Sequence, residues 1–349
     1  EKQMFPKFSP DGKKLAFVKK NNLYIKNLQD NSEDIITHDG EDNKIKNGWA
    51  DWVYEEEFGF VRAFDWSKDS KKVAYIRFDE SQVPEFSMSM FKKDLYPTVE
   101  TFKYPKAGEK NSEVSLHIYD VNTTSTKEIN LKNYADFYIA RLKWTNDTNV
   151  LSAQVLNRHQ DNLDLLFVDA NSGTPKVVLN EKDKAYIDVT DNLTFLKDNS
   201  FIWTSEKNGF NHIYVYDKTG KLKNQVTNGN WEVTNYYGFD EKNQTVFYQS
   251  VENGSINRDV YRIGLNGKNK VRLSQNTGTN AATFSPNFNY FINSFSSASQ
   301  PTTYTLNDAK SGKELQSIEN NSGLVEKLKA YNLPSKEFFV LKTAKGNEL

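Results

Sequence analysis

The stretch Phe8-Ser9-Pro10-Asp11-Gly12-Lys13-Lys14-Leu15-Ala16-Phe17-Val18 decides the fold. An aromatic residue and a polar turn lead into an apolar strand. A second turn at Asn21-Asn22 is followed by another strand, Leu23-Tyr24-Ile25. The same succession of aromatic residue, polar turn and paired strands returns along the chain, which predicts a fold built from repeated antiparallel units.

The repeat has a measurable period. Each unit begins at an aromatic residue, and these residues are Phe8, Trp66, Trp144, Phe195, Phe239 and Phe284. The steps between them are 58, 78, 51, 44 and 45 residues. A period of roughly 40–50 residues with short strands is typical of β-propeller blades, which bury their faces by stacking on one another. We therefore expect an all-β chain, a β-propeller with about six to seven recognisable blades.

The two long steps contain insertions. The first holds an acidic stretch, Asp51-Trp52-Val53-Tyr54-Glu55-Glu56-Glu57-Phe58, and the second holds a segment broken by Pro84, Pro97 and Pro105. Proline does not fit a central strand, so we expect loops or a small subdomain there. Such insertions on a repeat scaffold usually carry binding.

Two interpretations of the acidic stretch are open. A run of glutamates is commonly a solvated turn. Alternatively, adjacent carboxylates held against aromatic rings repel one another, and a bound cation such as a substrate ammonium group relieves that repulsion.

The composition excludes several classes of function. The 349 residues carry 45 Lys and Arg against 46 Asp and Glu, which argues against a nucleic-acid binder. Cysteine is absent and the four histidines form no close pair, so we expect no metal site. No apolar run is long enough to span a membrane. We find no motif for a nucleotide, a cofactor or a serine nucleophile, and we expect no cofactor and no catalytic residues in this chain.

The end of the chain departs from the repeat. Residues 322–329 have the pattern of a short helix, and residues 337–342 that of a last strand. We expect a propeller domain over residues 1–336, with blade material missing at its N-terminal end. Residues 337–349 would begin the connection to a further domain.

Several motifs resemble those of one family. The stretch Asp51–Glu57 is similar to the double-glutamate motif of dipeptidyl peptidase IV and its relatives, serine exopeptidases of the prolyl oligopeptidase clan. Further landmarks follow in the family's order, namely Phe64-Asp65-Trp66-Ser67, Val83-Pro84, Tyr104-Pro105-Lys106-Ala107-Gly108, Gly229-Asn230-Trp231-Glu232-Val233 and Leu333-Pro334-Ser335-Lys336. The sequence from Tyr54 to Trp66 looks most like that of the Bacteroidetes enzymes.

The resemblance implies an eight-bladed propeller followed by an α/β-hydrolase domain that carries the Ser, Asp and His of catalysis. It implies that Glu56 and Glu57 lie on a short helix and bind the free N-terminal ammonium of a peptide, with Glu55 as a structural neighbour. It also implies release of Xaa-Pro or Xaa-Ala dipeptides, a possible homodimer involving the proline-rich insertion, and a periplasmic or secreted location.

Two features depart from the family. An arginine that the family uses beside the glutamates would lie upstream of Glu1, and residues 186–193 contain no arginine where mammalian members have one. Two alternatives stay open. The chain could be a stand-alone propeller that binds protein or glycan, or part of a relative that releases tripeptides.

Overall fold

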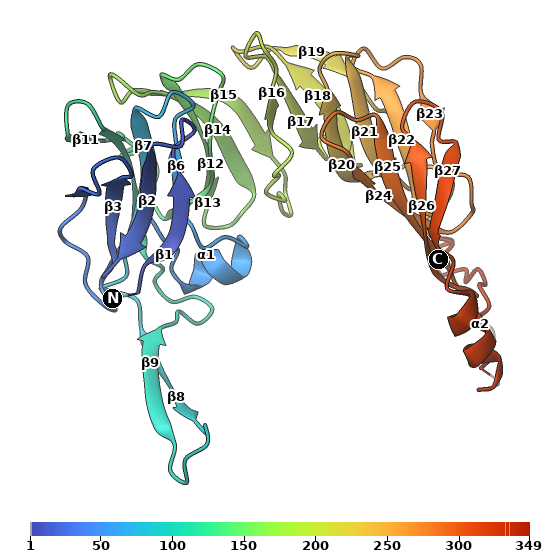
Figure 1. Ribbon diagram of the computed structural model, residues 1–349, viewed down its shortest axis with the longest axis horizontal. Helices are drawn as coiled ribbons and strands as arrows, with labels where there is room; N and C mark the ends of the chain where they lie inside the picture. The colour runs from blue at the N-terminus through green and yellow to red at the C-terminus, as the bar shows by residue number, and fades with distance from the viewer. Residues whose placement is uncertain (1, 332, 335) are drawn as a thin grey trace. The chain divides into compact units, whose positions relative to one another are not determined.

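The computed structural model describes residues 2–331, 333–334 and 336–349. Over these residues the strands form six antiparallel sheets of four or five strands, and one separate two-stranded hairpin (Figure 1). The six sheets match the six repeat signals, and the β-propeller prediction is confirmed.

The first three sheets occupy the N-terminal half. Their strands are β1 (Met4–Phe8), β2 (Lys14–Lys19), β3 (Asn22–Asn27) and β4 (Glu33–Ile35); β5 (Ile45–Asn47), β6 (Phe64–Trp66), β7 (Lys72–Asp79), β10 (Glu113–Asp120) and β11 (Ser125–Glu128); and β12 (Phe137–Trp144), β13 (Val150–Asn157), β14 (Asn162–Asp169) and β15 (Pro175–Lys182).

The other three sheets follow in order. Their strands are β16 (Thr194–Phe195), β17 (Phe201–Ser205), β18 (His212–Tyr216) and β19 (Leu222–Gln225); β20 (Val233–Asp240), β21 (Thr245–Ser250), β22 (Asp259–Gly264) and β23 (Val271–Arg272); and β24 (Thr279–Phe284), β25 (Tyr290–Ser297), β26 (Gln300–Asp308) and β27 (Glu314–Glu319).

Burial along each sheet explains the strand sequences. The second and third strands are covered on both faces, as in β17 and β18, where all five residues of each strand are buried. Such strands consist of nearly continuous apolar residues, whereas the last strand, as in β27, is fully exposed and polar-rich. This gradient is what a stack of blades produces, because only the middle of each blade lies between neighbours.

The repeated aromatic residues tie neighbouring blades together in the N-terminal half. The indole N–H of Trp66 donates to the carbonyl of Lys7 at 3.1 Å, and the indole N–H of Trp144 donates to the carbonyl of Asp65 at 3.1 Å. Both rings are buried, at 3% exposure. Each aromatic therefore fills the space between blades and satisfies a backbone carbonyl of the blade before it.

The innermost strand of the second sheet is interrupted. β5 pairs with Arg77–Asp79 of β7, and β6 pairs with Val73–Tyr75, so Ile76 lies opposite the break. The N–H of Gly48 donates to Ile76 O at 3.0 Å, and the N–H of Ile76 donates to Ala63 O at 2.9 Å. The ladder therefore continues across the break while the intervening chain leaves the blade and forms helix α1 (Trp52–Glu57).

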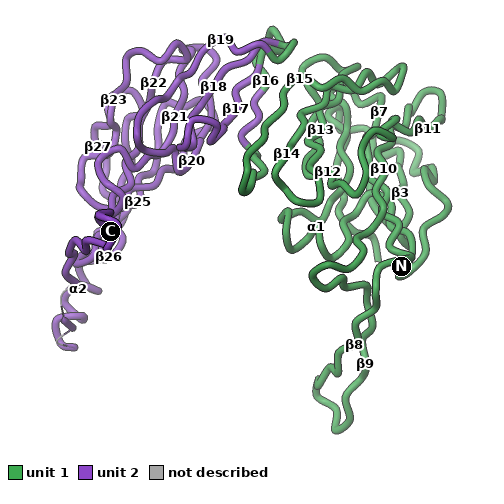
Figure 2. Tube along the Cα trace, turned by 180° about the vertical axis from the view of Figure 1, so that it is seen from behind, with its two compact units in different colours: residues 1–191, 195–200, 218–220 green, residues 192–194, 201–217, 221–349 purple. Residues whose placement is uncertain are grey.

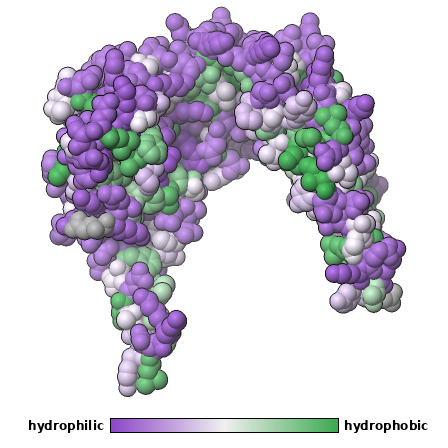
Figure 3. Space-filling model, in the orientation of Figure 1, coloured by the Kyte–Doolittle hydropathy of each residue, from purple (hydrophilic) through white to green (hydrophobic). Residues whose placement is uncertain are grey.

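The second insertion is a hairpin that leaves the same blade between β7 and β10. Its strands, β8 (Glu85–Met90) and β9 (Thr98–Lys103), pair only with each other. Its tip exposes Phe91, Leu95 and Tyr96 at 77%, 88% and 80%, and Figure 3 shows apolar atoms at this end of the molecule. A role of this hairpin in a homodimer stays a prediction.

The chain divides into two compact units, coloured in Figure 2. The first holds residues 1–191, 195–200 and 218–220, and the second holds the remainder. Both insertions belong to the first unit. No helix within the described residues is long and apolar enough to cross a membrane.

The predicted C-terminal helix is confirmed as α2 (Ser322–Lys329), with no buried residue. The strand predicted over 337–342 is wrong. These residues form only an isolated bridge between Lys342 and Glu348, and Phe338 to Leu341 are exposed. A strand requires a partner, and in the described chain these residues find none beyond that bridge. The predicted boundary at residue 336 stays a prediction.

Replacing Trp144 by Phe tests the tie between blades. The change leaves the carbonyl of Asp65 without this donor, and we expect a loss of about 1–3 kcal/mol in the free energy of unfolding. Urea unfolding of the chain measures it. Trp231→Phe is the matched control, because the half-buried Trp231 has no hydrogen bond from its indole within the described residues. Equal losses in both variants would contradict the role given to the hydrogen bond.

Candidate functional site

Helix α1 carries the predicted site residues. Asp51 caps its N-terminus and accepts a hydrogen bond from the Tyr54 N–H at 2.9 Å. Gly59, at φ +67°, directs the chain away after the last turn, in a conformation that glycine adopts without strain. Six residues are too few for a helix to be stable by itself. Its stability must therefore come from contacts with the blades.

Tyr54 supplies the largest of these contacts. Its side chain is 2% exposed, and its hydroxyl accepts a hydrogen bond from the backbone N–H of Ile139 at 2.8 Å. Its ring lies within 4.8 to 5.9 Å, centroid to centroid, of four aromatic rings. These belong to Phe58, Phe60, Phe78 and Tyr138. The helix is thus fixed to the second and third sheets at once.

Asp51 is a buried carboxyl at the start of the helix. The hydroxyl of Ser112, from the chain just before β10, donates to its Oδ2 at 2.5 Å. Burial raises the pKa of Asp51, while the hydrogen bonds from Ser112 and Tyr54 and the charge of Lys46 act in the opposite direction. The helix N-terminus is therefore tied to the C-terminal end of the hairpin insertion, directly before β10.

The base of the hairpin also contacts the helix. Trp52 and Tyr104 lie with ring centroids 4.1 Å apart, and Tyr104 contacts Phe86 of β8 at 5.4 Å. Lys103 donates to the carbonyl of Val83 at 2.9 Å and closes the base of the hairpin. The two insertions thus form one packed assembly on the second blade.

The glutamates project from this anchored helix. Glu55, Glu56 and Glu57 are all exposed, and none makes a side-chain hydrogen bond or ion pair within the described residues. Glu56 and Glu57 lie in the last turn, where the helix dipole adds negative potential to that of the carboxylates. The arrangement is suited to binding a cation.

The loop after β15 lies near the glutamates. Burial raises the pKa of Tyr186, and the charges of Asp188 and Glu57 raise it further. This loop is the region where the sequence lacks the arginine of mammalian members. The carboxylate of Asp188 adds negative charge near Glu57, which again favours a cationic ligand.

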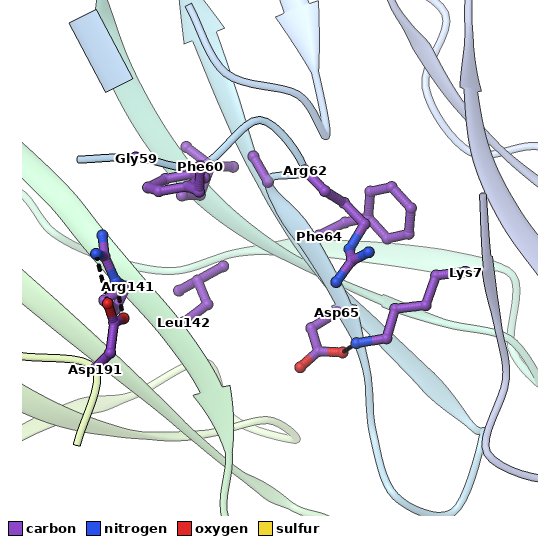
Figure 4. Close-up of a pocket in the computed structure, with 11 residues that line it drawn as sticks. Lys7, Gly59, Phe60, Arg62, Phe64, Asp65, Arg141, Leu142 and Asp191 are labelled. Carbon is purple, nitrogen blue, oxygen red and sulfur yellow. Dashed lines mark hydrogen bonds and ion pairs between the residues drawn. The ribbon is translucent and has the colours of Figure 1, made fainter. Parts of the chain in front are cut away.

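A cavity of about 240 Å³ opens beside the helix, within the first unit (Figure 4). Gly59 and Phe60, directly after α1, form one wall, and Arg62, Arg141 and Asp191 are among its other lining residues. This cavity could not be identified from the sequence, because its residues are far apart in the chain. The only signal was a basic residue, Arg62, five positions after Glu57.

The geometry defines the class of protein as a β-propeller in which a helix bearing paired carboxylates is inserted into a blade. A family model described as the dipeptidyl peptidase IV (DPP IV) N-terminal region matches residues 1–302, and the chain belongs to this family. The resemblance found in the sequence is therefore confirmed.

Individual proteins of this family are also similar to the chain. The crystal structure of Porphyromonas gingivalis dipeptidyl peptidase 4 is similar to this chain with 45% identity and a TM-score of 0.94, over 100% of this chain and 50% of that one. Dipeptidyl peptidase 4 of Trichophyton rubrum is 29% identical over 99% of this chain and 46% of that protein. Dipeptidyl peptidase 4 of Trichophyton equinum is 29% identical over 99% of this chain and 46% of that protein. The chain thus spans about half the length of the curated relatives it matches.

The buried carboxyl of Asp51 gives a prediction on pH. Its pKa in the folded state lies above the ordinary value of 3.8, so the folded state binds the proton more tightly than the unfolded state does. The stability that Asp51 contributes is therefore present below pH 3.8 and is lost as the pH rises through the pKa that Asp51 has in the folded state. Asp51→Asn keeps an N-cap and removes the titration.

We expect the difference in unfolding free energy between Asp51→Asn and the unmodified chain to shift in favour of the variant as the pH rises above about 4. Urea unfolding at a series of pH values measures it. A difference that stays constant across the series would show that Asp51 does not titrate differently in the folded state.

Proposed function

We propose that this chain is the substrate-recognising propeller of a serine dipeptidyl peptidase, and that Glu56 and Glu57 bind the α-ammonium group of the peptide. The observation that carries the proposal is a pair of exposed carboxylates, unpartnered within the described residues, on a helix that Asp51 and Tyr54 anchor to two blades. The names of the relatives support the reaction class.

The chemistry of the pair explains a preference for chain ends. An ammonium group donates three hydrogen bonds, and two carboxylates accept them with opposite charge. A peptide bond in the same place offers one neutral donor and leaves the carboxylates without a counter-charge. The pair therefore rejects the interior of a polypeptide and accepts a free N-terminus.

The rigid anchoring of the helix also determines which peptide bond is cleaved. Because the helix is fixed to the blades, the ammonium is held at a set distance from a nucleophile in the catalytic domain. In our proposal that distance corresponds to two residues and gives Xaa-Pro or Xaa-Ala dipeptides. The Ser, Asp and His lie in an α/β-hydrolase domain in the rest of the protein, so this chain alone is inactive.

The proposal includes export of the enzyme to the periplasm or the medium, which the family resemblance implies. Cell fractionation followed by detection of the full-length protein tests this part separately.

Glu56→Gln and Glu57→Gln in the full-length protein test the ammonium site. Each change removes a charge-assisted hydrogen bond worth about 1.5–3 kcal/mol, so kcat/KM for an H-Gly-Pro chromogenic substrate should fall about tenfold to a hundredfold. The double variant should fall further. Glu55→Gln is the matched control, since we assign Glu55 no contact with substrate, and its kcat/KM should stay within about twofold of the parent.

N-acetylation of the substrate should abolish turnover by the parent enzyme. Near-normal turnover by the double variant would refute the assignment of Glu56 and Glu57. Mass spectrometry of the products from an unlabelled peptide would decide between dipeptide and tripeptide release.

A further inference from the structure

The cavity beside α1 has an unusual charge content for its size. Its lining includes three cations and two carboxylates, and apolar side chains make up most of the remaining walls. The charged residues are Lys7, Arg62, Asp65, Arg141 and Asp191. These residues come from β1, the loop before β6, β6, β12 and the loop after β15. Figure 4 shows Arg62 on the same side as Lys7 and Asp65, with the Arg141–Asp191 pair across from them.

Two of the cations are already neutralised. Lys7 pairs with Asp65, and Arg141 pairs with Asp191, whose Oδ2 accepts from Nη2 at 3.1 Å. The hydrogen bond from Arg141 holds the pKa of Asp191 below its usual value, so this pair is charged on both sides at neutral pH. Arg62 has no ion pair within the described residues. The cavity therefore carries one uncompensated guanidinium.

Each of the guanidinium groups of Arg62 and Arg141 lies near an aromatic ring. The Arg62 guanidinium carbon lies 6.0 Å from the centroid of the Phe64 ring, and that of Arg141 lies 5.6 Å from the centroid of the Phe60 ring. Such contacts favour particular orientations of the planar group. A guanidinium beside an apolar wall can bind a carboxylate through two parallel hydrogen bonds.

The cavity is close to the proposed ammonium site. Gly59, in its wall, follows Glu57 by two residues, so their Cα atoms are at most about 7 Å apart. A ligand that bridges them must carry a positive and a negative charge. A peptide whose first residue is aspartate or glutamate has this charge pattern.

We propose that this cavity, with Arg62 as its anion-binding residue, is a specificity subsite for an acidic side chain on the first residue of the peptide. The inference rests on the proposed function, because Glu56 and Glu57 must hold the ammonium of the same residue. The space of about 240 Å³ accommodates a glutamate side chain, and the net charge of the lining is complementary to it.

The test compares two substrates of the full-length protein that differ in one charge, H-Glu-Pro and H-Gln-Pro linked to the same chromogenic group. The readout is the ratio of their kcat/KM values. We expect Arg62→Gln to lower the Glu/Gln ratio about threefold to tenfold, as fits one partly exposed ion pair. Arg62→Lys keeps the charge without the planar fork and should give an intermediate ratio.

Lys218→Gln is the charge-matched control, since Lys218 is exposed and does not line the cavity. Its Glu/Gln ratio should equal that of the parent. An equal fall in this control would assign the effect to the general field of the protein and overturn the proposal.

An unchanged ratio in Arg62→Gln would overturn it as well. If both kcat/KM values change by the same factor, Arg62 only screens the glutamates. Failure of the proposed function is distinguishable, because it appears as full turnover in the Glu56→Gln, Glu57→Gln double variant whatever Arg62 does.

Discussion

The hydrogen bond from the Ile139 N–H to the buried hydroxyl of Tyr54 is the interaction on which the site depends. A six-residue helix has too few internal hydrogen bonds to hold its own shape. Tyr54 fixes it by pairing with the third blade while its ring packs among four others. The buried side chain of Tyr54 therefore sets the position of the exposed glutamates, and the ammonium binding proposed above would require no ordering of the helix.

Electrostatics divide the surroundings of this helix into two parts. Glu56 and Glu57 lie at the negative end of the helix, near a loop that carries Asp188. The surface around these carboxylates therefore attracts cations. A few residues further on, the spare charge of Arg62 makes the adjoining cavity attractive to anions. A surface with both signs at close range recognises the separation of charges in a ligand as well as their sum.

Much of the fold was predictable because it repeats. Trp66 and Trp144 sit in the sequence at the start of apolar strands, and the structure shows them joining successive blades. The placement of Glu56 and Glu57 on a helix followed from resemblance. The cavity was not predictable, since Lys7, Arg141 and Asp191 come together only through blade stacking. The strand predicted over residues 337–342 was wrong for a different reason. These residues favour a strand, but a strand forms only beside another strand.

The break opposite Ile76 has a consequence for how such a protein can evolve. The hydrogen bonds from Gly48 to Ile76 and from Ile76 to Ala63 keep the inner ladder intact on both sides of the excursion. A change in the length or the exposed side chains of the excursion between them therefore need not change the register of β7. A different inserted segment can therefore replace the present one at this position of the blade, while the rest of the propeller keeps its sequence.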